Sequence, residues 1–333
     1  MFLINFRKVR FNGRGNGRRL HDHIVIVSCK EFFGWATFGL LYIFKCPFCT
    51  ESQTLKMGNA VFSNFEKTIK EIFMPNKKTA IITGSSSGIG AGIAKALAQA
   101  GFNIVINGSR DPEKIEDFRS GLEADYGITA RYDRANMTKP DEIEGMIINA
   151  RESFGSVDII VNNAGIQHVA PVDEFPVEKW DAILSINLSS AFHMIRVAAP
   201  LMKKNGWGRI VNIASAHALV ASPFKSAYVA AKHGLAGLTK TVALELAEEN
   251  ITCNAVCPGY VKTPLVAGQI ASQAKERGIT EEEVVRDVIL GAQPTKKFTT
   301  VEELGALVVF LCSEPAGNIT GAIIPVDGGW TAH

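Results

Sequence analysis

The order of strand-like and helix-like segments constrains the fold of this chain more than any other feature. From residue 79 onward, short runs rich in β-branched residues alternate with stretches in which Ala, Leu, Glu and Lys recur at helical spacing. Apolar strands that alternate with crossover helices predict a parallel sheet covered by helices on both faces. We therefore expect an α/β fold with one doubly wound domain. The seven expected strands are 79–83, 103–107, 129–133, 157–162, 208–213, 251–256 and 322–326.

Residues 1–73 have a different character. The first 21 residues carry six Arg or Lys and no acid, and residues 32–44 form an uncharged run of 13 residues. That run is shorter than the roughly 20 residues that a membrane-spanning helix needs. A basic start before a short apolar run has the outline of a targeting segment, but no typical cleavage site follows it. We expect an N-terminal extension over 1–73, poorly structured or the product of a mis-assigned start, and a catalytic domain over 74–333.

Cysteine usage and net charge limit the cellular setting and the partners. The six cysteines form no disulfide framework, so a reducing compartment is expected. Cys253, Cys257 and Cys312 lie in apolar surroundings and are predicted to be small buried hydrophobic residues. Cys46 and Cys49 form a C-x-x-C pair without a surrounding βαβ pattern, which leaves a redox centre and a chance pair both open. A net charge of +2 indicates neither nucleic acid nor stable membrane association. The expected location is cytoplasmic, or the mitochondrial matrix if residues 1–73 are a transit segment.

A glycine-rich loop follows the first strand of the domain. Gly84, Gly88 and Gly90 stand between the strand and a helical run, so the backbone can turn tightly and approach a pyrophosphate. The N-terminus of that helix would offer free N–H groups and a partial positive charge to the phosphates. The loop therefore predicts dinucleotide binding in a Rossmann-type domain.

The spacing G-x-x-x-G-x-G in TGSSSGIG resembles the cofactor loop of the short-chain dehydrogenase/reductase family. The resemblance extends from Met74 to His333, and further family landmarks occur in order: Asn162 to Gly165, Asn187, Ser215, Tyr228, Lys232 and Pro258-Gly259. It implies a cofactor site made of Gly84, Ser86, Ser87, Gly88, Ile89, Gly90, Asn136, Met137, Asn163, Ala164, Gly165, Tyr228, Lys232, Pro258, Gly259, Val261 and Thr263.

The end of the second strand bears on the choice of cofactor. A protein that binds the adenosine ribose of NAD usually has an acidic residue about 20 residues past the glycine loop. This strand instead ends Asn107-Gly-Ser-Arg110. Arg110 could meet the 2′-phosphate of NADP or be a solvated loop residue. Asn136 stands where the family usually has an aspartate near adenine, and its amide oxygen could accept from the adenine amino group. NAD is the predicted cofactor, with NADP open.

Tyr228 and Lys232 are four residues apart, which places them on one face of a helix. A lysine ammonium and the positive nicotinamide ring would both lower the pKa of the tyrosine, so that the phenolate could take a hydroxyl proton as hydride leaves. Ser215, at the end of a strand, would hydrogen-bond the reacting oxygen. The resemblance implies that Lys232 also holds the nicotinamide ribose and that Asn187 supports a proton path.

Polar residues near this triad indicate the substrate. A lysine among neutral donors suits a small carboxylate. The resemblance implies a branch of the family that interconverts (R)-3-hydroxybutyrate and acetoacetate, although Tyr260 stands where that branch often has tryptophan. The expected substrate-binding residues are Gln167, Ser215, His217, Lys225, Tyr228, Tyr260, Gln269 and Trp330.

Two alternatives stay open at this point. One is an NADPH-dependent reductase of 3-oxoacyl thioesters, which would not need the carboxylate contact; the other is a catalytically silent cofactor-binding scaffold, which would not need the triad. Residues 262–295 are expected to form a helical lid over the substrate. The resemblance also implies a homotetramer. No metal is expected.

Overall fold

The computed structural model describes residues 3–15, 18–31, 34–43, 77–262, 266, 270–271, 274–275 and 277–332. The chain divides into two compact units, Met1–Pro75 and Asn76–His333. In the first unit the backbone forms an antiparallel sheet of β1 (Leu3–Gly15), β2 (Arg18–Glu31) and β3 (Gly34–Ile43). Strands are thus present where we expected an extension with little structure, and the role of residues 1–73 stays a prediction. Cys46 and Cys49 lie outside the described residues.

The second unit contains the predicted parallel sheet. Its strands lie in the order β10-β9-β8-β7-β4-β5-β6, and all six neighbouring pairs are parallel. The doubly wound α/β fold is confirmed. The strands are β4 (Thr79–Ile82), β5 (Asn103–Asn107), β6 (Ala130–Asp133), β7 (Ile159–Asn162), β8 (Gly208–Ile213), β9 (Ile251–Pro258) and β10 (Ile323–Val326).

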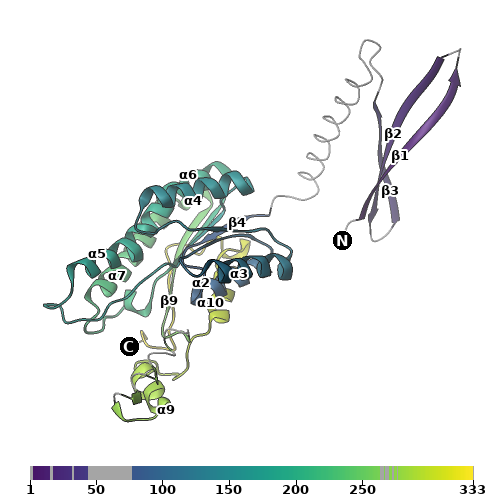
Figure 1. The fold of residues 1–333 in the computed structure, drawn as a ribbon. Helices are drawn as coiled ribbons and strands as arrows, with labels where there is room; N and C mark the ends of the chain where they lie inside the picture. Colours follow the sequence, from purple (N-terminus) through teal and green to yellow (C-terminus); the bar gives the residue numbers. More distant parts are fainter. Residues whose placement is uncertain are drawn as a thin grey trace. The chain divides into compact units, whose positions relative to one another are not determined.

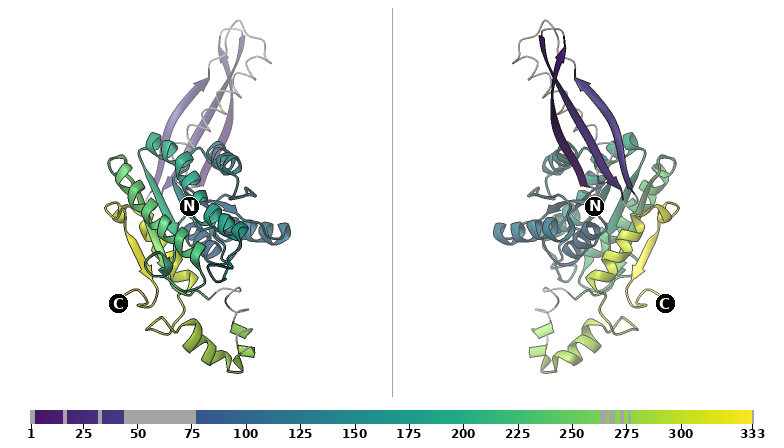
Figure 2. Two further views of the ribbon diagram at one scale, coloured as in Figure 1. Left: turned by 90° about the vertical axis from the view of Figure 1, so that its left-hand side faces the viewer. Right: turned by 90° about the vertical axis from the view of Figure 1, so that its right-hand side faces the viewer.

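Helices cover both faces of this sheet (Figure 1). Along β4 the side chains alternate, so that Ala80 and Ile82 join one hydrophobic core and Ile81 joins the other. The first core takes side chains from α2 (Gly88–Gln99), α3 (Pro112–Tyr126) and α10 (Val301–Leu311). The second takes them from α4 (Pro140–Phe154), α6 (Ser190–Asn205) and α7 (Ser226–Glu245). Figure 2 shows these layers from two further sides.

The three cysteines of this unit are buried, as predicted. Cys253, Cys257 and Cys312 are free thiols with almost no exposed surface. Burial raises the pKa of the Cys253 and Cys312 thiols to about 12 and that of Cys257 to about 11. They are therefore protonated packing residues at neutral pH.

A continuous helical segment, Val177–Asn205, crosses the second face. It consists of α5 (Val177–Leu184), a wider π-helical turn (Ser185–Ser189) and α6. Its length and apolar composition would suffice for a membrane span. However, Met194, Ala198 and Met202 are fully buried against the sheet, which is the environment of a core helix.

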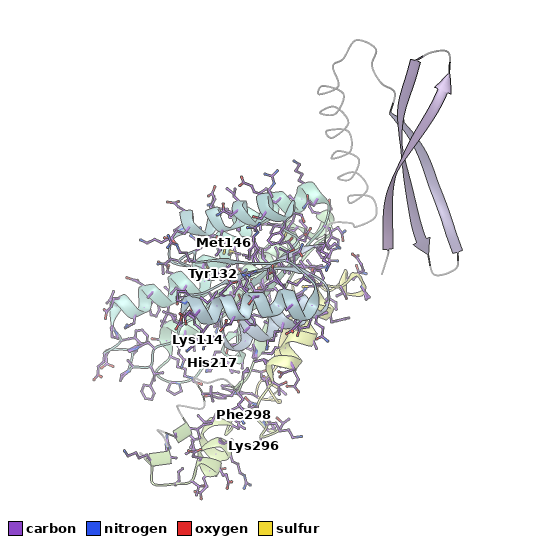
Figure 3. All side chains as sticks on the ribbon, turned by 45° about the vertical axis from the view of Figure 1, so that its right-hand side comes forward. Lys114, Tyr132, Met146, His217, Lys296 and Phe298 are labelled. Atoms are coloured by element: carbon purple, nitrogen blue, oxygen red, sulfur yellow. The ribbon has the colours of Figure 1, made fainter. Side chains whose placement is uncertain are left out.

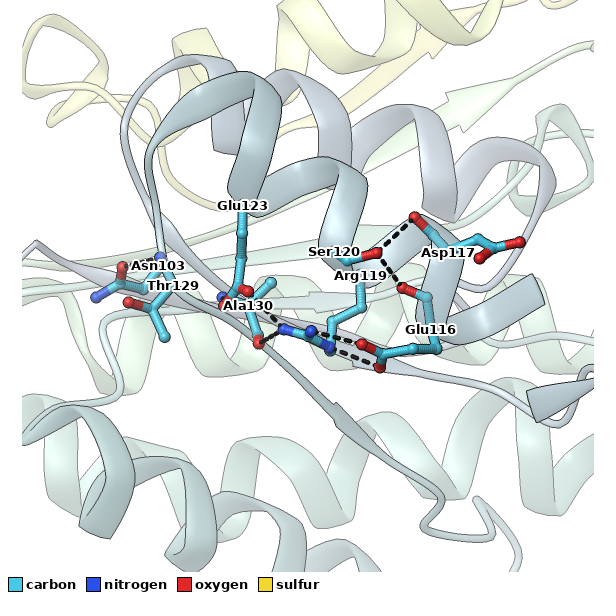
Figure 4. Close-up of polar contacts among 8 residues, drawn as sticks. All are labelled: Asn103, Glu116, Asp117, Arg119, Ser120, Glu123, Thr129 and Ala130. Atoms are coloured by element: carbon cyan, nitrogen blue, oxygen red, sulfur yellow. Dashed lines mark hydrogen bonds and ion pairs between the residues drawn. The ribbon is translucent and has the colours of Figure 1, made fainter. Parts of the chain in front are cut away.

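The outer edge of the sheet is fixed by a polar network between α3 and β6 (Figure 4). Arg119 on α3 donates to both carboxylate oxygens of Glu116, at 2.8 and 2.6 Å, and to the Ala130 carbonyl of the edge strand, at 3.0 Å. The Thr129 N–H donates to Asn103 on the neighbouring strand. These hydrogen bonds connect the edge strand β6 to α3 and to the neighbouring strand β5.

The expected lid is only partly helical among the described residues. A short turn, α9 (Glu281–Glu283), has a capping box with Thr280 and continues into a π-helical segment, Val284–Ile289. Val284 and Ile289 form a small core with Ile270, against which Tyr260 packs. Lys296, labelled in Figure 3, donates to two carbonyls at the end of this segment and so caps it.

Candidate active site

β4 lies between β5 and β7 in the sheet. The chain continues from β4 to β5 and β6 on one side and then to β7 and β8 on the other, and the glycine loop follows β4 at this switch point. Ligands of doubly wound sheets bind in the crevice at such a position, beyond the carboxyl ends of the strands. The Asn163 amide after β7 donates to the carbonyls of Thr83 and Gly84, at 2.9 and 3.0 Å. The Thr83 hydroxyl in turn accepts from the N–H groups of Asn163 and Ala164, both at 3.0 Å. The loop is therefore held by the neighbouring strand end.

Two glycines of the loop occupy positions where a side chain would not fit. Gly84 has φ +62°, and a Cβ there would lie 2.9 Å from the Ala164 Cα. At Gly90 a Cβ would lie 2.5 Å from both the Asn163 amide nitrogen and the Gly84 carbonyl oxygen. Close approach of backbone to backbone thus explains these two glycines.

The N-terminus of α2 fits a pyrophosphate. Ser87 precedes the helix in extended conformation, its side chain caps no helical N–H, and the first turn carries no acid. The N–H groups after Ser87, at Gly88, Ile89 and Gly90, therefore stay available to an anion. Ser86 lies beside the end of β5, where a Cβ on Gly108 would be 2.2 Å from its hydroxyl.

Asn136, which was expected near the adenine of the cofactor, makes a local contact in the structure. The Asn136 amide oxygen already accepts from the Thr138 N–H and hydroxyl, both at 2.9 Å, so it serves a local turn instead of facing an adenine. Met137 beside it is buried, and Arg110 after β5 is exposed. The structure thus assigns Asn136 a structural contact that its position in the sequence did not reveal.

The three triad residues meet at the carboxyl end of β8. Tyr228 and Lys232 lie on α7, and Ser215 lies close enough to Tyr228 for its hydroxyl to lower the pKa of the phenol. The Lys232 ammonium is buried, donates to the Ile213 carbonyl at 2.8 Å and lies 5.6 Å from the centre of the Tyr228 ring. The predicted grouping of a phenol, a hydroxyl and a cation is present.

Burial sets the direction of the pKa shifts of Tyr228 and Lys232. Burial raises the pKa of Tyr228, and the hydrogen bond with Ser215 lowers it by a smaller amount. Burial also lowers the pKa of Lys232 to about 8. Burial therefore dominates the Tyr228 pKa in the chain without cofactor, and the Lys232 ammonium donates to the Ile213 carbonyl. The expected lowering of the Tyr228 pKa by Lys232 and the oxidised nicotinamide stays a prediction.

Asn187 lies in the π-helical turn between α5 and α6. Its amide pairs with the backbone of Ile166, accepting from the N–H and donating to the carbonyl, both at 2.9 Å. The wider turn points this side chain at the loop after β7. The contact holds that loop, and the predicted role in a proton path stays a prediction.

Aromatic side chains that would line a substrate pocket lie beside Ser215 and Tyr228. The Trp330 ring stacks parallel to Tyr260 with centroids 5.8 Å apart, and the edge of His217 contacts both Trp330, at 5.0 Å, and Tyr228, at 5.8 Å. His217, labelled in Figure 3, lies on the turn after β8. Burial and the Lys225 charge lower the pKa of His217 to about 4, so its ring is neutral at neutral pH.

Lys225 contributes the cation of this pocket. It immediately precedes α7, is half-buried, and its ammonium lies 5.9 Å from the Tyr260 ring centre. Burial lowers its pKa. Within the described part of the chain, no carboxylate forms an ion pair with Lys225. A half-buried cation without a counter-charge favours an anionic ligand.

The remaining predicted residues are placed as follows. Gln167 is exposed on the loop after β7, Pro258 ends β9, and Val261 pairs with Thr299 in a single parallel bridge. Gly259 has no room for a Cβ, which would lie 2.5 Å from the Gln293 side-chain oxygen. Thr263 and Gln269 lie outside the described residues.

Sequence reasoning missed several residues that support the site. Asn107 at the end of β5 accepts from the Gly84 N–H at 3.2 Å and donates to the carbonyls of Asp133 and Ala135. Asp327 accepts from Gly329 and Thr331 and so forms the turn that carries Trp330. A polar residue at the end of an apolar strand was the available signal for Asn107.

Comparison with known proteins agrees with this geometry. A family described as Enoyl-(Acyl carrier protein) reductase matches residues 84–331. Over 256 residues the chain is 58% identical to the D-beta-hydroxybutyrate dehydrogenase of Rhizobium meliloti (strain 1021), covering 77% of this chain and 99% of that protein. It is 54% identical over 260 residues to the D-beta-hydroxybutyrate dehydrogenase of Cupriavidus necator, covering 78% and 100%. A candidate short-chain alcohol dehydrogenase of Sinorhizobium meliloti 1021, solved by crystallography, superposes with a TM-score of 0.69 at 34% identity, covering 77% of this chain and 96% of that one.

Proposed function

This chain belongs to the short-chain dehydrogenase/reductase family, and on that premise we propose that it interconverts (R)-3-hydroxybutyrate and acetoacetate with NAD. The observation that carries the proposal is the half-buried Lys225, which lies without an acidic partner in the described structure, beside the Ser215–Tyr228 pair. A substrate carboxylate would supply its counter-charge. Two relatives of more than half identity bear the name of this activity.

Ser215 and Tyr228 act on the reacting oxygen. Ser215 hydrogen-bonds that oxygen, and Tyr228 takes the hydroxyl proton in the oxidation or returns it in the reduction. The bound nicotinamide would accept or supply the hydride and, when oxidised, add a positive charge near the phenol. Because burial raises the Tyr228 pKa, the positive charge of an oxidised nicotinamide would help to favour the phenolate.

Lys232 holds its ammonium in place through the Ile213 carbonyl. At a pKa of about 8 it is largely protonated at neutral pH and can donate to a ribose hydroxyl. It therefore serves as a positioning group for the cofactor and as a nearby positive charge.

The pocket suits a short substrate. The Lys225 ammonium lies 5.9 Å from the Tyr260 ring centre, and the His217 ring lies 5.0 Å from Trp330, so the cation and the aromatic rings are close together. The carboxylate of a four-carbon acid would pair with Lys225 while its short carbon chain packs on the rings. A thioester would leave the Lys225 charge unpaired, so the 3-oxoacyl thioester reductase is the weaker proposal.

NAD is the proposed cofactor, and a cytoplasmic homotetramer is the proposed form of the protein. The arginine that could accept a 2′-phosphate, Arg110, is exposed and forms no ion pair in the described structure. The assay below therefore compares NAD and NADP directly, together with the substrate.

One assay tests the function. Initial rates are measured for (R)- and (S)-3-hydroxybutyrate, each with NAD and with NADP, alongside reduction of acetoacetyl-coenzyme A with NADPH. We expect the (R)-acid with NAD to give the highest kcat/KM. A higher kcat/KM for the thioester would replace the proposed function with the thioester reductase, and no activity with any pair would favour a silent scaffold.

A further inference from the structure

The ring of His217 is held between two serine hydroxyls. Its Nδ1 lies 3.3 Å from the Ser215 Oγ, and its Nε2 lies 2.9 Å from the Ser222 Oγ. The ring is buried, with 4% of its surface exposed. Because it is neutral at neutral pH, one nitrogen carries a proton and the other accepts, so the two serines cannot both be donors to it.

The choice of tautomer decides where the Ser215 proton can go. The Ser215 Oγ already accepts from the His217 backbone N–H at 3.2 Å, which leaves one lone pair and one proton. If Nδ1 were unprotonated, it would compete for the Ser215 proton, which the reacting oxygen of the substrate needs. If Nδ1 carries the proton, it donates to the last lone pair of Ser215, and the Ser215 proton is left for Tyr228 or the substrate.

We propose that Ser222 is a positioning residue that donates to Nε2 of His217, keeps the ring proton on Nδ1 and thereby directs the Ser215 hydroxyl proton toward the reacting oxygen. The proposal deepens the proposed dehydrogenase function and rests on it for the identity of that oxygen. Ser222 contacts neither the substrate nor the cofactor in this proposal; it acts only through the His217 imidazole.

The backbone around Ser222 is held in the required place. Phe224 adopts φ +66°, which is unfavourable for a residue with a side chain, and its carbonyl accepts from the Ala170 N–H at 3.0 Å. The contact ties the segment after β8 to the loop after β7. Such a conformation persists only where neighbouring contacts enforce it, so the position of Ser222 is fixed by the fold.

The experiment combines nitrogen NMR with kinetics on the full chain. In protein labelled with ¹⁵N-histidine, we expect His217 to show a pyrrole-type shift at Nδ1 and a pyridine-type shift at Nε2, assigned by comparison with His217→Gln. In Ser222→Ala we expect the His217 ring nitrogens to lose this pair of shifts. We also expect kcat to fall about tenfold, which corresponds to the free energy of one hydrogen bond, with the KM for NAD unchanged. Ser222→Thr keeps a hydroxyl and should restore both.

A matched control is available on the same segment. The Ser226 hydroxyl is buried without a hydrogen-bond partner in the described structure, so Ser226→Ala removes a serine oxygen without disturbing His217. We expect unchanged kcat and an unchanged spectrum. The proposal is overturned if the unmutated protein carries its proton on Nε2, or if Ser222→Ala keeps the spectrum and kcat. The NMR result needs no substrate, so it stands even if (R)-3-hydroxybutyrate is not turned over.

Discussion

Replacing Lys225 by methionine tests the charge in the pocket. Methionine keeps the length and apolar character of the lysine stem but removes the ammonium. In the structure the lysine is half-buried and has no ion-pair partner among the described residues, so its loss leaves none of their carboxylates unpaired. The fold should therefore tolerate the change, and the effect should appear in substrate binding.

The size of the effect follows from the contact that is lost. Two unit charges about 4 Å apart at an effective dielectric constant near 20 attract by about 4 kcal/mol, and part of this is offset by stripping water from both groups. The net value for a hydrogen bond to a charged group is about 1.5–3 kcal/mol. At 1.4 kcal/mol per factor of ten, kcat/KM for (R)-3-hydroxybutyrate should fall roughly 10- to 150-fold.

A neutral substrate separates the charge from other effects. With methyl (R)-3-hydroxybutyrate, which has no carboxylate, we expect Lys225→Met and the unmutated enzyme to give similar kcat/KM. Lys204→Met on α6 is the control, because that lysine is exposed and, like Lys225, has no ion-pair partner among the described residues. The reasoning is refuted if Lys225→Met leaves kcat/KM for the acid unchanged, or lowers it equally for acid and ester.

Three further predictions concern the triad and the glycine loop. Tyr228→Phe removes the acid–base group, so kcat should fall by about 10²–10⁴ while NADH binding, followed by fluorescence, persists; retained turnover would contradict the assignment. Gly90→Ala would place a Cβ 2.5 Å from the Asn163 amide nitrogen, so the free energy of unfolding in urea should fall by about 1–3 kcal/mol and NADH affinity by at least about tenfold. The pKa of Lys232 is about 8 in the folded protein and near 10.4 in an unfolded chain, so the folded state loses its proton first. The unfolded state then binds more protons, so the free energy of unfolding should rise with pH between about 8 and 10.4, by up to roughly 3 kcal/mol relative to Lys232→Met. If the difference in free energy of unfolding between the two proteins does not change with pH, the lowered pKa is excluded.

The sequence predicted those parts of the molecule that depend on local pattern. All seven strands of the sheet lie within two residues of their expected limits, and most are short runs rich in apolar residues; β6, with the sequence ARYD, is the exception. The i, i+4 spacing of Tyr228 and Lys232 also translates directly into a shared helix face. Both features are fixed by residues close together in the chain.

The parts that were missed depend on burial and on side-chain hydrogen bonds, which helix and strand spacing does not report. The Tyr228 pKa is dominated by burial, which spacing along a helix does not report. The Asn136 amide was assigned to adenine because its local turn with Thr138 was not considered. Asn107 contacts residues 23 to 28 positions away, and Ser222 meets His217 across a turn of five residues, so helix and strand spacing reports neither contact. The backbone strands β1–β3 lie within the expected 1–73 extension, whose role stays a prediction.

The hydrogen bonds that fasten the glycine loop to the ends of β5 and β7 have a thermodynamic consequence. The glycine loop is already ordered by hydrogen bonds within the chain, which involve Asn107, Asn163 and Thr83. The entropy cost of ordering this loop is therefore part of folding, and dinucleotide binding does not incur it again. Titration calorimetry with NADH should therefore give the modest negative heat-capacity change of docking onto a rigid surface. A value large enough to correspond to 1,000 Å² or more of newly buried surface would indicate that the loop folds around its ligand.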